Sequence, residues 1–307
     1  MINSVTVCIC THNRSSLLTM VLDKMEIISK TISGYCFDLL IVDNGSKDNT
    51  RDVAAHYVAN NPEKFRYIFE EKLGLSNARN RGLKESASDV IVFIDDDAVP
   101  RDGWLEGLLE GFLAGENVGV VGGQVILALP KQGIPRWLKK PLYEYYSEKV
   151  IVKEGLADCA SIVDYPYGAN ISFRRKLAIE MGGFNARLGR IGNQMLSGEE
   201  TQLCHEIKKN GYRILLNSKS MVDHHIPLKR ITVRNLLKQA WGDGKVCLIW
   251  SCDDFVPLET KFSFAAAVKC IATHAIALIF KPPTACNLVK SLYETVRDFS
   301  FYYHSVK

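Results

Sequence analysis

Short apolar runs alternate with segments of helical periodicity along the first 127 residues. The runs are rich in β-branched and aliphatic residues without polar alternation, and they lie at residues 4–10, 37–43, 66–71, 89–94 and 118–127. Strands of this kind, each followed by a helix, are typical of a parallel sheet covered by helices on both faces. The pattern predicts a doubly wound, mostly parallel α/β half over residues 1–127.

The rhythm changes after residue 128. A stretch rich in proline, basic and aromatic residues predicts a mobile or interfacial loop at 129–149. A strand entering a helix, an amphipathic helix and one or two strands follow, at residues 165–184, 197–212 and 213–225. We therefore expect residues 128–230 to complete the same α/β domain and residues 231–307 to form a C-terminal helical extension.

Residues 262–280 are apolar enough to raise the question of a membrane span. Their length fits one, but Lys269, Thr273 and His274 interrupt the middle. A central lysine costs roughly 3 kcal/mol on insertion scales. We expect a buried or interfacial helix instead.

Composition and missing motifs narrow the class of protein. The chain of 307 residues is 47% hydrophobic with a net charge of +4, too weakly basic for a nucleic-acid binder but compatible with an anionic ligand or a membrane surface. Nine cysteines without a C-x-x-C pair predict buried free thiols, and with no signal peptide before the first strand we expect a cytoplasmic protein. A P-loop and a dinucleotide-binding fold are excluded, because G-x-x-x-x-G-K-[ST] and a G-x-G-x-x-G after the first strand are both missing.

Polar segments follow three of the predicted strands, at Thr11–Arg14, Asp43–Ser46 and Asp95–Asp97. In doubly wound sheets, ligands bind beyond the carboxyl ends of the strands. The sequence therefore predicts a binding site at this edge of the sheet.

Three consecutive carboxylates at Asp95–Asp97 require neutralisation, because neighbouring anions repel by about 1 kcal/mol at 4 Å in water. One interpretation is an acidic helix start with Asp102 as a further cap. The other is a divalent cation that bridges to phosphate oxygens. Asp-x-Asp spacing on an extended backbone directs the first and third side chains to one side, which would let Asp97 hold a metal while Asp95 reaches a ribose hydroxyl.

Other polar residues also allow two interpretations each. Asp43 precedes Asn44-Gly45 and forms either an Asx-turn or a ligand contact. Arg79 lies either in solvent or against a diphosphate.

A pair of glutamates and a pair of histidines in the second half are equally ambiguous. Glu199 and Glu200 begin a predicted helix, where carboxylates also complement the helix dipole. His224 and His225 are either packed side chains or additional metal ligands.

Seven motifs in order then resemble one known family. They are CTHNR, IVDNGSKDNT, GLSNARNRGL, FIDDDAVPRDGWL, YGANISFRR, GGFNARLG and SGEETQL, spanning about residues 1–225. They resemble the family 2 glycosyltransferases, which are inverting enzymes with the GT-A fold. The resemblance implies a nucleotide-binding half (1–127), an acceptor-binding and catalytic half (128–230) and non-processive transfer.

The resemblance also implies roles for individual residues. Nucleotide-sugar contacts fall on Thr11, Asn13, Arg14, Asp43, Arg79, Asp95 and Asp96; metal ligands on Asp95, Asp97 and His224 or His225; and acceptor contacts on Asn170 and Trp137. The family's GED motif supplies the catalytic base from its aspartate. Here Glu200, one methylene longer, takes that place, and Glu199 is the alternative base.

The implied reaction moves a hexose from a nucleoside diphosphate sugar, UDP-sugar first, to a hydroxyl of a glycan or lipid-linked acceptor. Mg²⁺ or Mn²⁺ stabilises the leaving anion, and a glutamate takes the acceptor proton. Trp137 and its basic neighbours either contact lipid on the inner face of the membrane or pack over the site. The rival functions are a nucleotidyltransferase that makes a nucleotide sugar and a non-catalytic nucleotide-sugar-binding protein.

Overall fold

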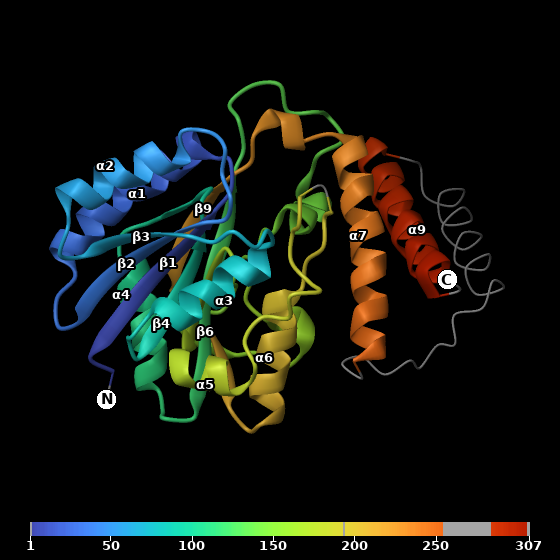
Figure 1. Ribbon diagram of the computed structural model, residues 1–307. Coiled ribbons are helices and arrows are strands. Elements are labelled where there is room, and N and C mark those ends of the chain that lie inside the picture. Colours follow the sequence, from blue (N-terminus) through green and yellow to red (C-terminus); the bar gives the residue numbers. More distant parts are fainter. Residues whose placement is uncertain (1, 193, 254–283, 306–307) are drawn as a thin grey trace. The chain divides into compact units, whose positions relative to one another are not determined.

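The computed structural model describes residues 2–192, 194–253 and 284–305 (Figure 1). The predicted helix at 262–280 lies outside these described residues. Within the described ranges, no helix combines the length and the apolar character needed to cross a bilayer.

The chain divides into two compact units. Unit 1 comprises residues 1–128, 147–186 and 199–225, and unit 2 comprises residues 129–146, 187–198 and 226–307. The boundaries expected from the sequence, at 127 and 230, stay a prediction.

A nine-stranded sheet forms the centre of unit 1. Its strands are β1 (Ser4–Thr11), β2 (Cys36–Asp43), β3 (Phe65–Phe69), β4 (Val90–Asp95), β5 (Ala98–Pro100), β6 (Val118–Ala128), β7 (Leu156–Asp158), β8 (Asn170–Arg174) and β9 (Arg213–His225). They lie in the order β3-β2-β1-β4-β8-β6-β9-β5, and β7 pairs with β9.

The sheet is mostly parallel in its first part, as predicted. Strands β3, β2, β1 and β4 are parallel neighbours, but β8 pairs antiparallel with both β4 and β6. Strand β6 therefore does not lie beside β4, and the first 127 residues do not complete the sheet alone. The insertion of β8 was not predicted, because strand order depends on pairing between distant segments.

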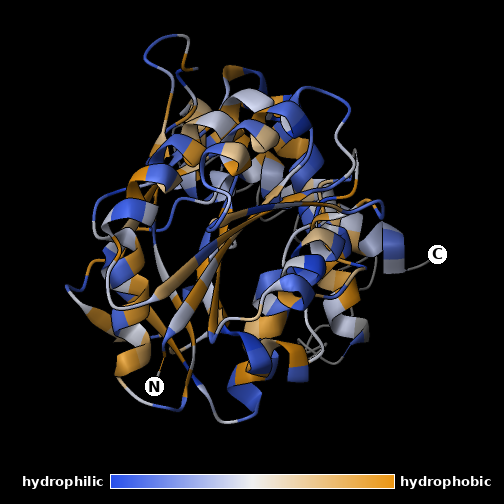
Figure 2. Ribbon diagram, turned by 60° about the vertical axis from the view of Figure 1, so that its left-hand side comes forward, coloured by the Kyte–Doolittle hydropathy of each residue, from blue (hydrophilic) through white to orange (hydrophobic). Residues whose placement is uncertain are grey.

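Helices cover both faces of the sheet, as predicted. They are α1 (Ser15–Thr31), α2 (Thr50–Asn60), α3 (Leu75–Glu85), α4 (Trp104–Leu113), α5 (Arg175–Glu180) and α6 (Glu199–Lys209). Alternate side chains of β1 point to opposite faces: Val5 and Val7 pack with α1, α2 and α4, while Cys8 packs with α3, α5 and α6. Apolar residues accordingly colour much of the central strands (Figure 2).

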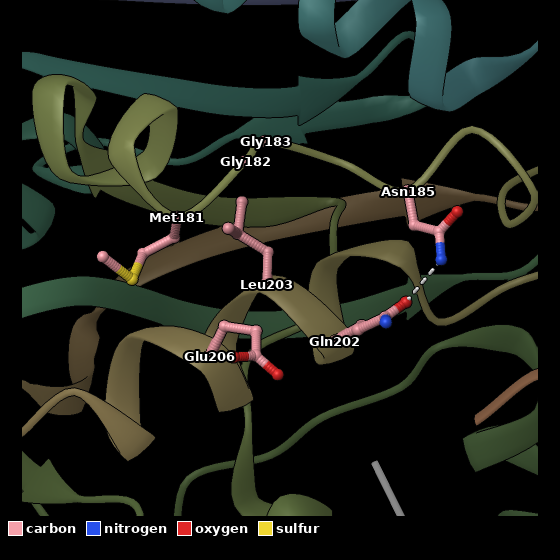
Figure 3. Close-up of a pocket in the computed structure, with 7 residues that line it drawn as sticks. All are labelled: Met181, Gly182, Gly183, Asn185, Gln202, Leu203 and Glu206. Atoms are coloured by element: carbon pink, nitrogen blue, oxygen red, sulfur yellow. Dashed lines mark hydrogen bonds between the residues drawn. The ribbon is translucent and has the colours of Figure 1, made fainter. Parts of the chain in front are cut away.

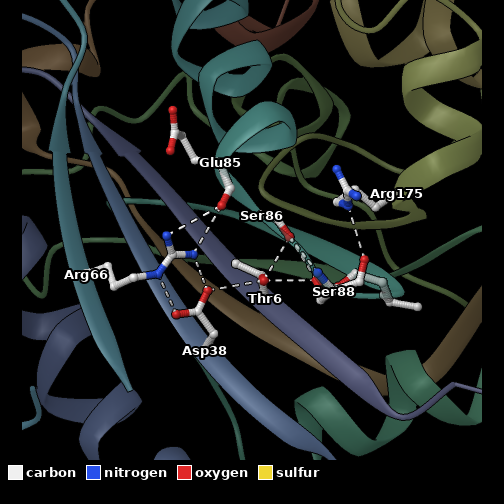
Figure 4. A network of polar contacts seen from close by, with 8 residues as sticks. Thr6, Asp38, Arg66, Glu85, Ser86, Ser88 and Arg175 are labelled. Carbon is white, nitrogen blue, oxygen red and sulfur yellow. Dashed lines mark hydrogen bonds and ion pairs between the residues drawn. The ribbon is translucent and has the colours of Figure 1, made fainter. Parts of the chain in front are cut away.

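A polar network closes the sheet near the amino-terminal ends of β1, β2 and β3 (Figure 4). The Arg66 guanidinium donates to both carboxylate oxygens of Asp38, at 2.9 and 2.6 Å. Hydroxyls of Ser86 and Ser88 donate to the Thr6 hydroxyl at 2.8 and 2.9 Å. The polar segments predicted for the site, at Thr11–Arg14, Asp43–Ser46 and Asp95–Asp97, lie instead at the opposite, carboxyl ends of β1, β2 and β4.

The described part of unit 2 is largely helical, which confirms the C-terminal helical extension. Helices α7 (Val233–Cys252) and α9 (Ala285–Ser305) pack side by side (Figure 1). Their close approach depends on Gly244, where a β-carbon would lie 2.2 Å from the Arg297 carbonyl oxygen. Tyr145 from the short 3₁₀ helix η1 (Lys140–Tyr146) stacks on Tyr293 of α9 at 3.9 Å between ring centroids.

Candidate active site

Three strands end at the same edge of the sheet with polar residues. The parallel register pairs Thr11 with Asp43 and Cys10 with Asp95. The residues predicted for the site in the first half are therefore brought to one edge, as the sheet topology requires.

An arginine from the loop after β1 pairs with two of the three carboxylates of the acidic triplet. Arg14 Nη1 donates to Asp96 Oδ1 at 2.7 Å and to Asp97 Oδ2 at 2.8 Å. The Thr11 hydroxyl donates to Asp96 Oδ2 at 2.7 Å. Burial raises the pKa of Asp96 to about 6, with Arg14 opposing and Asp97 adding to the rise. In this structure Thr11 and Arg14 thus bind the carboxylates, and their contact with a nucleotide stays a prediction.

Three potential metal ligands lie together at this edge. One ligand atom each from Asp95, Asp97 and His224 lies within 4.8 Å of the others, and His224 Nε2 is 3.1 Å from Asp97 Oδ1. The pairing of β5 with β9 places His224 opposite Ala98, directly after the triplet. Carboxylate oxygens suit Mn²⁺ or Mg²⁺, and the imidazole nitrogen of His224 adds a common metal ligand, so the donor set fits a divalent cation.

His225 contacts the acidic triplet through its backbone rather than through its side chain. Its backbone N–H donates to the Asp97 carbonyl oxygen at 2.7 Å, and the group of potential metal ligands in the described chain contains His224. Of the two histidines, the geometry favours His224.

The loops after β1 and β2 are held by their own side chains. Asp43 is 1% exposed, and its carboxylate accepts from the Ser46 N–H and the Tyr67 hydroxyl, both at 2.9 Å. Asn13, at φ 53°, accepts from the Lys47 N–H at 2.7 Å. The first contact holds the loop after β2 against Asp43, although it reaches the residue three positions on rather than the two of an Asx-turn. Base recognition by Asp43 and nucleotide contact by Asn13 stay predictions.

Arg79 of α3 connects the acidic triplet to the glutamate pair. Its guanidinium is buried between carboxylates: Nη1 donates to Glu199 Oε1 at 2.7 Å, and Nη2 to Asp95 Oδ1 at 3.3 Å. Glu200 Oε2 is 3.8 Å from Nη1. Burial and the neighbouring Glu200 raise the pKa of Glu199, and the positive charge of Arg79 opposes this rise.

Gly168 is a site residue that the motif analysis did not single out. Its N–H donates to Glu200 Oε1 at 3.2 Å, and a β-carbon at this position would lie 2.2 Å from Arg79 Nη2. The only signal for it in the sequence was its position in the YGAN motif. A glycine is required here because the guanidinium packs against the backbone.

Replacing Gly168 with alanine is expected to reduce turnover by about 10–100-fold, because a displacement near 1 Å in a catalytic group has this effect. The added methyl must push Arg79 away from its three carboxylates. The thermal midpoint should fall as well, since the methyl overpacks a buried site, so turnover is compared at a temperature at which both proteins are folded. Steady-state kinetics and a thermal melt test this, and wild-type turnover would contradict it.

The two residues expected to contact the acceptor lie in different surroundings. Asn170 is fully buried; its Oδ1 accepts from Trp104 Nε1 at 2.8 Å and its Nδ2 donates to the Gln124 carbonyl at 3.0 Å. Trp137 belongs to unit 2 and is partly exposed. Both acceptor contacts stay predictions, and for Asn170 the structure also supplies a packing role.

A pocket lies further along α6 (Figure 3). It is lined by Met181, Gly182, Gly183, Asn185, Gln202, Leu203 and Glu206. Asn185 Nδ2 donates to Gln202 Oε1 across it at 3.0 Å. These lining residues include none of those predicted for the site.

This fold and site define an α/β enzyme with a candidate cation site of two aspartates and a histidine beside a buried glutamate pair. The family model "Glycosyl transferase family 2" matches residues 6–182. The chain therefore belongs to glycosyl transferase family 2, and it is a glycosyltransferase. Glucosyl-dolichyl phosphate glucuronosyltransferase of Haloferax volcanii is 26% identical over 233 residues, which cover 72% of this chain and 69% of that protein.

Two solved structures share the fold. The mannosyltransferase PcManGT from Pyrobaculum calidifontis, in complex with GDP-Man and Mn²⁺, has a TM-score of 0.63 at 18% identity and covers 98% of this chain and 87% of its own. GalNAc-T7 with UDP, GalNAc and Mn²⁺ has a TM-score of 0.59 at 14% identity and covers 99% and 57%. These likenesses agree with the GT-A fold expected from the sequence.

Proposed function

We propose that the protein transfers a hexose from a nucleoside diphosphate sugar to a hydroxyl of a glycan or lipid-linked acceptor, with inversion in a single displacement. The observation that carries this proposal is the group formed by Asp95, Asp97 and His224, linked through Arg79 to Glu199 and Glu200. Such a group offers one place for a diphosphate-bound cation and another for a proton acceptor, which are the two requirements of the reaction.

Each side of the group has a role in this proposal. Asp95, Asp97 and His224 would hold Mn²⁺ or Mg²⁺, which when bound stabilises the negative charge of the leaving diphosphate as a Lewis acid. Glu200 would take the proton of the acceptor hydroxyl, a contribution of ~10²–10⁴-fold. Arg14 offsets the charge of Asp96 and Asp97 at the sheet edge.

The class of donor and acceptor is supported by the similar proteins. The two solved structures named above contain GDP-Man and UDP, both with Mn²⁺, and the name of the Haloferax relative includes a lipid-linked sugar, glucosyl-dolichyl phosphate. We propose a UDP-sugar as the first donor to test and a lipid-linked acceptor, met by peripheral contact of the protein with the inner face of the plasma membrane.

A donor panel tests the proposal. The protein is incubated with Mn²⁺ and UDP-, GDP-, dTDP- or CMP-sugars, and free nucleotide is measured with and without EDTA. We expect metal-dependent release of nucleoside diphosphate from one donor, as slow hydrolysis even without the acceptor.

Other outcomes of the panel identify the rival functions. Release of pyrophosphate from a nucleoside triphosphate and a sugar phosphate would indicate a nucleotidyltransferase. Donor binding without turnover, indifferent to Glu200→Gln, would indicate a binding protein. No binding of any nucleotide sugar would reject the proposal.

A further inference from the structure

The buried guanidinium of Arg79 contacts three carboxylates in this site. The Arg79 guanidinium is 3% exposed and lies within 4 Å of carboxylate oxygens from Asp95, Glu199 and Glu200. These three residues come from β4 and from the start of α6. A planar guanidinium with several donors can bind carboxylates in different directions at once, which an ammonium group does less well.

We propose that Arg79 is a positioning residue, held by Glu199 as its counter-ion, which fixes Asp95 on one side and the base Glu200 on the other. This inference rests on the proposed function and deepens it, since it assigns different roles to the two adjacent glutamates. Glu199 is then not the base, and Arg79 is not a ligand of the diphosphate.

The packing around Arg79 restricts it to one orientation. Its guanidinium carbon lies 6.0 Å from the centroid of the Phe93 ring and 5.6 Å from that of Phe184. The Gly168 backbone lies against Nη2, where a β-carbon would approach to 2.2 Å. A guanidinium held on several sides cannot swing out to a ligand without breaking the 2.7 Å bond to Glu199.

The two glutamates differ in burial and in the strength of their contacts. Each has an Oε2 atom without a hydrogen-bond partner in the described part of the chain. The Glu199 side chain is 3% exposed and forms the short ion pair. The Glu200 side chain is 13% exposed, and its contacts with Arg79 and the Gly168 N–H are longer, at 3.8 and 3.2 Å. Glu200 can therefore exchange a proton with a bound hydroxyl at the smaller cost in lost contacts.

Four variants test the assignment, each compared with wild type for turnover at saturating donor and for donor affinity in Mn²⁺. The donor is the nucleotide sugar that wild type hydrolyses. Glu199→Gln keeps an oxygen that can accept from Arg79, and its turnover should stay within about tenfold of wild type. The turnover of Glu200→Gln should fall ~10²–10⁴-fold. The turnover of Arg79→Lys should fall about 10–100-fold and that of Arg79→Met further, while the donor affinity of both stays within about threefold of wild type.

A matched control separates positioning from general ion-pair loss. Arg66→Lys removes a bidentate arginine–aspartate pair near the other end of the strands, and it should leave turnover unchanged. If Arg79→Met does not fold, Arg79→Lys and Glu199→Gln still decide the question.

Two variant results would overturn the inference. One is a Glu199→Gln protein as inactive as Glu200→Gln, and the other is an Arg79→Lys protein that binds the donor more weakly but keeps its saturated turnover. Either result would give these residues other roles. A wild-type protein that releases no nucleoside diphosphate from any donor overturns this inference and the proposed function together. If wild type releases nucleoside diphosphate but Glu199→Gln abolishes this release and Glu200→Gln does not, the inference fails while the proposed function stands.

Discussion

Replacing Asp97 with asparagine is expected to weaken Mn²⁺ binding by at least ~100-fold and to reduce nucleotide release by ~10²–10³-fold. The Asp97 side chain is 2% exposed, with Oδ1 3.1 Å from His224 Nε2 and Oδ2 2.8 Å from Arg14 Nη1. The amide keeps the volume but removes the negative charge that a divalent cation requires of its ligands. The loss should therefore fall on metal affinity first.

Two measurements check this result. Titration with Mn²⁺, followed by the electron paramagnetic resonance signal of the free ion, gives the affinity without any donor, and nucleotide release gives turnover. Asp102→Asn is the matched control, because Asp102 is an exposed aspartate paired only with Lys24 at 2.7 Å in the described chain. An Asp97→Asn protein that binds Mn²⁺ like wild type would show that the cation site lies elsewhere.

The apolar runs of the sequence were sufficient to predict the strands that end at the site. Strands β1, β2 and β4 are buried on both faces over most of their length. Each is therefore mainly apolar, apart from Thr6 and Asp38 near the starts of β1 and β2, and is followed by a polar loop. Once they are parallel neighbours, Thr11, Asp43 and Asp95 must lie at one edge. This part of the site follows from local pattern and one rule of topology.

The partners of the charged residues could not be predicted in the same way. Arg14 and Asp96 are 82 residues apart in sequence, and Arg79 and Glu199 are 120 apart. Local patterns do not show which distant charges meet, so Arg14 and Arg79 were both expected to face the nucleotide. In the structure both bind carboxylates, which is also how the repulsion within the acidic triplet is offset.

The burial of Asn170 is a second feature that could not be predicted from the sequence. Strand β8 is short and lies between β4 and β6, and this position encloses its first residue completely. An exposed asparagine and a buried one look alike in a motif. The difference has a large consequence for stability.

Truncating Asn170 to alanine is expected to destabilise unit 1 by about 2–4 kcal/mol, because it opens a cavity and strands two buried polar groups. The stranded groups are the Trp104 indole N–H and the Gln124 carbonyl, now bound at 2.8 and 3.0 Å. The thermal midpoint should fall by about 5–10 °C. Folded protein at low temperature should keep the donor affinity of wild type.

Ser172→Ala on the same strand is the control for the loss of one buried hydrogen bond. The Ser172 hydroxyl donates to the Val121 carbonyl at 2.6 Å, and its removal should cost about 1 kcal/mol. A direct acceptor contact predicts the opposite pattern for Asn170→Ala, with stability unchanged and transfer to the acceptor impaired. A thermal melt alone distinguishes these outcomes, since only a packing role makes Asn170→Ala much less stable than Ser172→Ala.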